Sequence, residues 1–191
     1  MAERINMQER TKEDILRAFN SLIEATDFDK ITVQMIIDEA GIGRTTFYRY
    51  FKDKYDVMNY NYERYLQEYL MTGKVQTFED FFNIMTAEGT EFFRHIRKVF
   101  DSNGANSFMN YLYEASFYAV QMILAMRGKT ELTPAEYLQY SYLCHGIPHL
   151  YKTWVQGDYP GLTSEEAAKA IYDLLPAEIQ GNLWETAHNG Q

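Results

Sequence analysis

Residues 31–54 hold the pattern that most limits how this chain can fold. After Thr32, a residue type that often caps a helix start, apolar side chains recur at helical spacing as far as Ala40. The run Gly41-Ile42-Gly43 then ends that helix, because glycine readily adopts the left-handed backbone conformation of helix C-termini. A second short segment, 44–50, follows at once. We therefore predict two short helices joined by a tight glycine turn, which is a helix-turn-helix.

The second of these helices should be apolar on one side only. Phe47 and Phe51 lie four residues apart, so they form its inward stripe. The outer positions are polar and long enough to reach a ligand: Arg44, Thr45, Thr46, Tyr48 and Arg49. An arginine at the start of such a helix can pair with the O6 and N7 atoms of guanine, and threonine can touch a thymine methyl group or a phosphate. The alternative interpretation is an ordinary corner between two helices of a helical protein.

Lys52, Asp53 and Lys54 follow, and Asp53 is placed to cap a long third helix. Lys54 and the N-terminus of that helix predict a phosphate clamp. Within 44–54 there are four basic residues and one acidic residue, a local charge of +3, although the whole chain carries −9. Residues 1–55 contribute −1 of that total and residues 56–191 contribute −8. Because the Debye length is about 8 Å at physiological salt, the local charge decides nucleic-acid binding and the acidic remainder is largely screened.

This stretch resembles the DNA-binding end of the TetR (tetracycline repressor) family of bacterial transcriptional regulators. The resemblance covers about residues 10–58. It rests on Ile15-Leu16, Ala18, Leu22-Ile23, Phe28, Ile31-Thr32-Val33, Ile36, Ala40-Gly41-Ile42, Thr45-Thr46-Phe47-Tyr48, Tyr50-Phe51, Lys54 and Val57-Met58. Ile37 departs from it, since the family usually has alanine there, so this side chain either fills a gap or pushes the helix outward.

The resemblance also implies roles for individual residues. Thr32 and Gln34 stand where the family places a phosphate contact and sometimes a base contact. Tyr48 and Tyr50 stand where the family's aromatic residues offer hydroxyl groups to phosphates. Arg49 stands at a variable position and could equally be solvated. The full set of predicted DNA-binding residues is Thr32, Gln34, Arg44, Thr45, Thr46, Tyr48, Arg49, Tyr50 and Lys54.

The rest of the chain predicts an all-α fold of two domains, with a helix-turn-helix domain over 1–54 and a helical effector-binding and dimerisation domain over 55–191. A first helix is expected over 11–25, capped by Thr11 with an inward stripe of apolar side chains, and Phe28 should plug the core of the small domain. A tyrosine-rich helix should run from residue 53 to about 72. Helical periodicity then predicts helices near 78–87, 90–101, 105–127, 133–156 and 163–175, with 105–127 at the centre of the body.

Residues 145–175 carry a second resemblance, to the dihydroxyacetone-kinase-regulator-like subgroup of the same family. Gly146, Trp154 and Gly157 carry most of it, and Pro148 departs from it and should kink its helix. In the family the last two long helices pair with their copies, which implies a homodimer. The expected interface residues are Tyr142, His145, His149, Trp154 and Ile171. The 176–191 segment, with Trp184, either docks on the body or frays.

Two groups of side chains leave alternatives open. His145 and His149 are four apart, a spacing that can hold a metal, but no third ligand completes the set, so packing or hydrogen bonding at an interface is the alternative. The aromatic residues of the body form either its core or the lining of an effector cavity. The candidates for such a cavity are Tyr62, Tyr65, Phe82, Phe93, Phe108, Tyr111, Phe117 and Tyr118.

The composition and the absence of known motifs limit which other classes of protein this chain can belong to. The single cysteine, Cys144, excludes an internal disulfide and fits a reducing cytoplasm, and neither a signal peptide nor a membrane-spanning run is expected. No nucleophile elbow, zinc motif or phosphate loop points to an enzyme, and no cofactor is predicted. We therefore expect a cytoplasmic, ligand-responsive repressor that binds a palindromic operator in double-stranded DNA as a homodimer, with an unknown small-molecule effector. The alternatives are a transcriptional activator or a helical protein-interaction module on the same scaffold.

Overall fold

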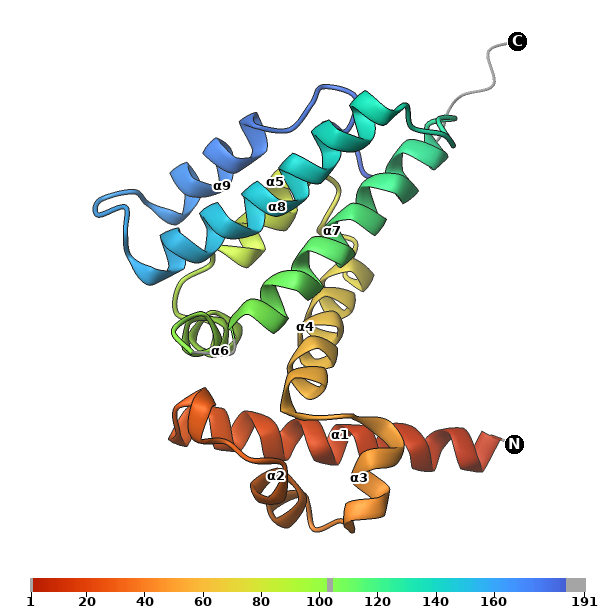
Figure 1. Ribbon diagram of the computed structural model, residues 1–191, viewed down its shortest axis with the longest axis vertical. Helices are drawn as coiled ribbons and strands as arrows, with labels where there is room; N and C mark the ends of the chain where they lie inside the picture. The colour runs from red at the N-terminus through yellow and green to blue at the C-terminus, as the bar shows by residue number, and fades with distance from the viewer. Residues whose placement is uncertain (1, 103–104, 185–191) are drawn as a thin grey trace. The chain divides into compact units, whose positions relative to one another are not determined.

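The computed structural model of the protein describes residues 2–102 and 105–184, with side chains described over 7–102 and 108–184, and in this range it contains helices and no strands (Figure 1). The predicted all-α fold is thereby confirmed. Across the same residues, no helix is long and apolar enough to cross a membrane. The helices are α1 (Ala2–Ala25), a 3-10 turn (Phe28–Lys30), α2 (Val33–Ala40), α3 (Arg44–Tyr50), α4 (Lys54–Met71), α5 (Phe78–Met85), α6 (Glu91–Phe100), α7 (Ala105–Met126), α8 (Pro134–Gln156) and α9 (Ser164–Asp173).

The contacts divide the chain into two compact units. The first comprises Met1–Gln67 and Lys98–Phe108, and the second comprises Glu68–Arg97 and Met109–Gln191. The first unit therefore reaches beyond residue 54 into α4, and it includes a second stretch of chain from the end of α6. Lys98 shows how that stretch attaches, since its Nζ donates to the carbonyl oxygens of Ile23 (2.6 Å) and Glu24 (2.8 Å). These carbonyls belong to the last turn of α1, where a helix has no backbone partners of its own.

In the first unit, α1 lies across α2 and α3 and packs against α2 (Figure 1). Ile15, Phe19 and Ile23 on its apolar stripe are fully buried. Phe28 is also buried and packs edge-on against Phe19 and Tyr55, which confirms that it plugs the core. One expectation about α1 is wrong. The helix begins at Ala2, so Thr11 lies in its interior.

The helix extends this far because the residues before Thr11 are themselves mostly good helix formers. The Thr11 hydroxyl therefore donates to the carbonyl of Met7 within the helix and caps nothing.

The second unit is built on α5, α7, α8 and α9, whose ends lie within two residues of those predicted. α7 and α8 run side by side in opposite directions, with the Tyr113 ring 3.8 Å from that of His145 and the Phe117 ring 4.9 Å from that of Tyr137. α8 is one continuous helix on both sides of Pro148. α7 is not enclosed at the centre of the body, because its side chains Tyr118 and Met122 are exposed.

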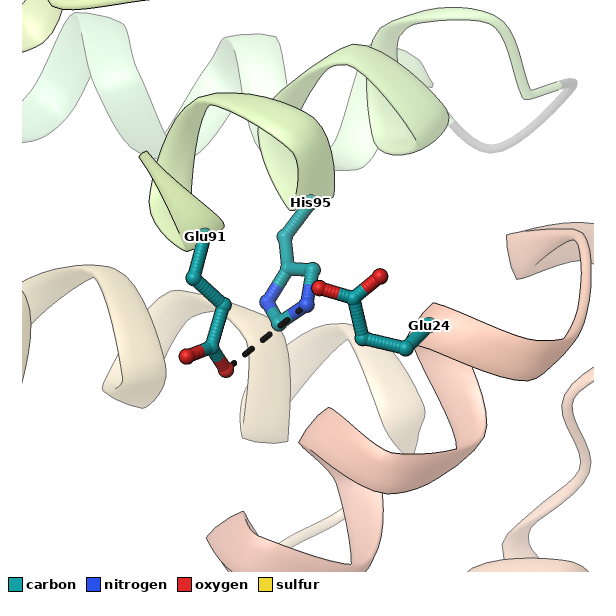
Figure 2. A group of neighbouring side chains, drawn as sticks. All are labelled: Glu24, Glu91 and His95. Carbon is teal, nitrogen blue, oxygen red and sulfur yellow. Dashed lines mark ion pairs between the residues drawn. The ribbon is translucent and has the colours of Figure 1, made fainter. Parts of the chain in front are cut away.

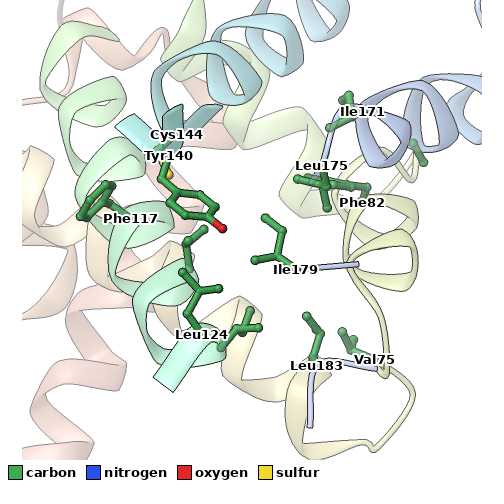
Figure 3. Packing of buried hydrophobic residues seen from close by; sticks show 13 residues of the cluster. Val75, Phe82, Phe117, Leu124, Tyr140, Cys144, Ile171, Leu175, Ile179 and Leu183 are labelled. Atoms are coloured by element: carbon green, nitrogen blue, oxygen red, sulfur yellow. The ribbon is translucent and has the colours of Figure 1, made fainter. Parts of the chain in front are cut away.

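A segment after α9, residues 176–184, closes the core of this unit (Figure 3). We call it the strap. Its Ile179 and Leu183 side chains are buried among those of α5, α7, α8 and α9. The Leu183 amide donates to the Gln76 carbonyl at 2.6 Å, and the Trp184 indole donates to the Val75 carbonyl at 2.9 Å. The segment therefore docks as far as Trp184, and residues 185–191 of the predicted tail lie outside the described part.

Candidate nucleic-acid interface

The glycine turn forms as its sequence requires. The Thr32 hydroxyl accepts a hydrogen bond from the Met35 amide at 3.2 Å and so caps α2. At the other end, Gly41 has φ 65°, which is the left-handed conformation that L side chains adopt only at a cost. The chain then reverses, and the Ile42 amide donates to the Ile37 carbonyl at 3.2 Å. Three residues separate the end of α2 from the start of α3, and the last of them, Gly43, is the N-cap of α3.

Two phenylalanines hold α3 against the rest of the first unit. Phe47 is completely buried, and the ring of Phe51, which is also buried, lies 6.1 Å from it and 5.5 Å from the ring of Tyr60. Ile37 is buried as well, so the larger side chain at this position is accommodated inside the unit. Because α3 has only seven residues, this anchor fixes which of its sides faces outward.

The outward side of α3 carries the residues that the sequence placed there. Arg44, Thr45 and Arg49 are exposed, and Tyr48 is 51% exposed while its ring stands edge-on to Phe47. Thr46 and Tyr50 are half-buried at the margins of this face. Within the described chain, no ion pair occupies Arg44 or Arg49. Both guanidinium groups are therefore available to an external anion or base edge.

The start of α2 offers a second, smaller set of polar groups. Thr32 and Gln34 are both exposed. The Gln34 amide donates to the Asp38 carboxylate at 2.8 Å, so it must leave this partner or share it in order to contact DNA. The hydroxyl oxygen of Thr32 already accepts the capping bond, which leaves its proton available to donate to a phosphate oxygen.

Lys54, the predicted phosphate clamp, already has hydrogen-bond partners within the first unit. Its Nζ donates to the carbonyl oxygens of Phe28 (2.8 Å) and Asp29 (3.1 Å), and it lies 4.7 Å from the centre of the Phe28 ring. Partial burial lowers the pKa of Lys54, against a smaller opposite effect of the Asp29 charge. The ammonium group therefore ties the start of α4 to the turn before α2. Sequence reasoning could not foresee these contacts, because they join residues 25 and 26 positions apart.

The Lys52 side chain is directed to solvent, whereas that of Lys54 is half-buried. Lys52 is exposed, without an ion pair among the described residues, in the short link between α3 and α4. Its backbone amide donates to Asp56, whereas Asp53 accepts from the amides of Tyr55 and Asp56, as predicted for a cap. The backbone of this link is thus fixed while the Lys52 side chain stays free.

The predicted effector residues fall into several environments. Tyr62, Tyr65 and Phe108 belong to the first unit, where burial raises the pKa of Tyr62 and its ring packs edge-on against Phe108. The other five belong to the second unit: Phe82, Phe93, Tyr111, Phe117 and Tyr118. Phe82 and Phe117 are core residues there, and Tyr118 faces solvent.

A small apolar hollow of about 220 Å³ lies elsewhere in the second unit, between α8 and α9. Its lining residues are Leu150, Trp154, Tyr159, Leu162, Ala167, Ala170, Ile171 and Leu174. None of the eight predicted effector residues is among them.

The predicted dimer residues separate by burial. Tyr142, His145 and His149 are exposed on α8. Trp154 and Ile171 are buried inside the subunit, where the Trp154 ring packs against Phe93 and its indole donates to the Leu162 carbonyl. These two residues were chosen because the resemblance places them on the last helices of the body, and a position on such a helix cannot distinguish an interface from a core.

His95 is a buried polar residue that the sequence did not single out. Its Nε2 atom lies 3.9 Å from the carboxylate of Glu91, one turn earlier on α6 (Figure 2). Glu24, the third residue drawn in Figure 2, belongs to the first unit. Cys144 is also buried, and this burial raises the pKa of its thiol to about 12, so the thiolate required for reaction or metal binding is scarce at neutral pH.

A comparison with family models identifies the domain that the first unit carries. Residues 11–60 match the model described as bacterial regulatory proteins, tetR family. The first unit carries a TetR-type DNA-binding domain. The matched range contains the glycine turn, all of α3 and the Lys52–Lys54 link. No curated protein matches the chain.

Proposed function

We propose that this protein is a ligand-responsive transcriptional repressor that binds a palindromic operator as a homodimer in the cytoplasm. The observation that carries the DNA-binding part is the asymmetry of α3. Phe47 is fully buried on one side, and Arg44, Tyr48 and Arg49 are exposed on the other. In a dimer, two such helices would enter successive major grooves about 34 Å apart.

Arg44 provides the sharpest test of base recognition. Operators are first selected from random duplex oligonucleotides, and the affinity of Arg44→Ala is then measured on the selected sequence and on its single-base variants. We expect a loss of about 1–3 kcal/mol that is concentrated at one base pair of each half-site. Arg97→Ala serves as the control, because it removes the same exposed side chain from α6 in the second unit. A selection that enriches no palindrome would instead favour a helical protein-interaction module.

A homodimer is supported by the exposed side of α8. Five of its exposed residues follow alternating steps of three and four, the spacing with which helices pair: Ala135, Leu138, Tyr142, His145 and His149. Leu138 and Tyr142 are 71% and 76% exposed, and Tyr118 and Met122 are exposed on the neighbouring α7. α7 and α8 together contain only three acidic or basic residues, Glu114, Glu136 and Lys152, in a chain of net charge −9. Two copies can therefore meet here with little repulsion.

The dimer is tested by placing a charge in this row. Leu138→Glu should convert the protein to a monomer in analytical ultracentrifugation, because each subunit would bury an unpaired carboxylate. Met71→Glu is the matched control, since Met71 is 89% exposed but lies at the end of α4. If both variants stay dimeric, the subunits associate through a different surface.

The proposal of repression, and not activation, rests on the usual behaviour of the TetR family. The C-terminal resemblance to the dihydroxyacetone-kinase-regulator-like subgroup supports an effector-controlled body, and that subgroup includes an activator. An effector can shift operator binding only by the difference between its affinities for the two states of the protein. Expression of a reporter from the selected operator, with and without the protein, separates repression from activation.

A further inference from the structure

The strap is held in the second unit by side chains and by scattered backbone contacts, without regular secondary structure. Residues 176–184 contain no helix, and an isolated bridge between Thr77 and Asn182 is their only strand-like pairing. Two of these side chains, Glu178 and Ile179, are adjacent in sequence and enter different surroundings. Glu178 meets a group of hydrogen-bond donors, and Ile179 enters the apolar core.

The donors around Glu178 come from α8 and from the end of α7. The Tyr140 hydroxyl, on a ring that is otherwise buried, donates to the Glu178 carboxylate, and Figure 3 shows this hydroxyl directed toward the strap. The Lys129 ammonium lies 3.6 Å from the other carboxylate oxygen. Burial and the Glu178 carboxylate together raise the pKa of Tyr140, which keeps the hydroxyl protonated and able to donate.

Arg127 completes this polar group. Its Nη1 donates to the backbone carbonyl of Glu178, and its Nη2 donates to that of Asn182 at 2.8 Å. Its Nε is buried and has no hydrogen-bond partner among the described residues. A buried donor without an acceptor is costly, so this corner has capacity for one more acceptor atom than the strap supplies.

The apolar part of the arrangement lies immediately beside the polar part. Ile179 is completely buried and belongs to one cluster with Phe82, Leu124 and Leu175 (Figure 3). The second unit thus accommodates a carboxylate and a branched hydrocarbon group side by side. The carboxylate meets a phenol and an ammonium group, and a guanidinium group holds the backbone carbonyls next to it. The hydrocarbon is enclosed by aliphatic and aromatic side chains.

We propose that the strap occupies a binding site for an aliphatic carboxylate, in which Glu178 takes the place of the ligand's carboxylate and Ile179 the place of its hydrocarbon chain. The ligand and the strap compete for the same donors and the same apolar space. Local opening of the strap is therefore the step that admits the ligand. The apparent affinity of the ligand is its intrinsic affinity reduced by the fraction of molecules in which the strap is open. This inference gives a chemical class to the effector proposed above.

The test uses the full chain without DNA, and decanoate below its micellar concentration as the probe. Binding is measured by calorimetry, and strap opening by hydrogen exchange of peptides that cover 176–184, where the Leu183 amide is hydrogen-bonded in the closed state. We expect decanoate to bind and to increase exchange in the strap. Because DNA is absent, failure here leaves the operator-binding proposal intact, and failure of operator binding leaves this proposal intact.

Two conservative variants of the same hydrogen bond should differ in their effect on decanoate binding. Glu178→Gln weakens the binding of the strap and leaves the donors to the ligand unchanged, so decanoate should bind about tenfold more tightly than to the parent protein. Tyr140→Phe removes a donor to the ligand's carboxylate, so decanoate should bind more weakly than to Glu178→Gln by at least tenfold. Glu165→Gln, which removes an exposed carboxylate from α9, should match the parent protein. Absence of decanoate binding in all four proteins, or equal affinity for the parent and Glu178→Gln, would overturn the proposal.

Discussion

Replacing Lys54 by alanine should lower the stability of the first unit. The side chain makes two hydrogen bonds from a charged donor to carbonyl oxygens, at 2.8 and 3.1 Å, and its ammonium group lies over the Phe28 ring. A net hydrogen bond to a charged group contributes about 1.5–3 kcal/mol, and an exposed cation–π contact about 0.5–1 kcal/mol. Since Lys54 is only half-buried, solvent weakens both contributions. We expect a total loss of about 2 kcal/mol in the free energy of unfolding.

Urea unfolding followed by circular dichroism measures this loss. With a typical slope of about 2 kcal/mol per molar, the urea midpoint should fall by about 1 M. Lys52→Ala is the matched control, because Lys52 is exposed in the same link. Its midpoint should stay within about 0.3 M of the parent value, since surface substitutions usually change stability by less than about 0.5 kcal/mol.

The dependence of operator affinity on salt then separates the two lysines. Each phosphate contact contributes about 0.9 to the slope of log K against log salt concentration. A dimer of Lys52→Ala should lose about two such contributions, and a dimer of Lys54→Ala should keep its slope. An unchanged urea midpoint together with a reduced salt slope for Lys54→Ala would refute this assignment, and would restore Lys54 as a phosphate ligand.

Two further predictions concern the backbone and the dependence on pH. Gly41→Ala should lower the free energy of unfolding by about 1–2 kcal/mol, because φ is 65° there. Gly146→Ala should raise it by about 0.5–1 kcal/mol, because Gly146 lies inside α8 with open space around the added methyl group. Thermal unfolding of both variants distinguishes the two signs. The Lys129 ammonium, followed by the Thr133 amide and hydroxyl, lowers the pKa of Glu136 from 4.5 to about 2. Because the pKa of the folded state is the lower one, Glu136 adds stability above about pH 4.5 that disappears as the pH falls toward 2. The urea midpoint of Glu136→Gln should therefore change less with pH across that interval than the parent midpoint does, and an equal change in both proteins would contradict the assignment.

Much of the first unit could be predicted because its signals are local. Thr32 caps α2, Gly41 adopts a positive φ, and the spacing of Phe47 and Phe51 orients α3; each of these depends on residues within one or two helical turns. The body helices were predictable for the same reason, since threonine and an acidic residue three positions later form capping boxes at the starts of α5, α8 and α9.

The roles of individual polar and apolar side chains were less predictable. Lys54 and Lys52 have the same side chain and lie two residues apart, yet only Lys54 reaches the carbonyls of Phe28 and Asp29. Trp154 and Tyr142 are both aromatic and lie on one helix, yet one is buried inside the subunit and the other is exposed. Helical periodicity identifies an apolar face, but it cannot tell whether the same chain or another molecule covers that face.

The amino-acid sequence by itself determined which side of α3 faces outward and, apart from the start of α1, where the helices begin and end to within about two residues. Capping, glycine conformation and periodic burial act over only a few residues. Only the tertiary structure decided that Lys54 is held by carbonyl groups, that Trp154 belongs to the core and that the strap fills the second unit. Those outcomes depend on contacts between residues from about 25 to more than 100 positions apart, such as that between Trp184 and Val75. Such pairs carry no signal in local spacing, since they form only when the whole unit packs.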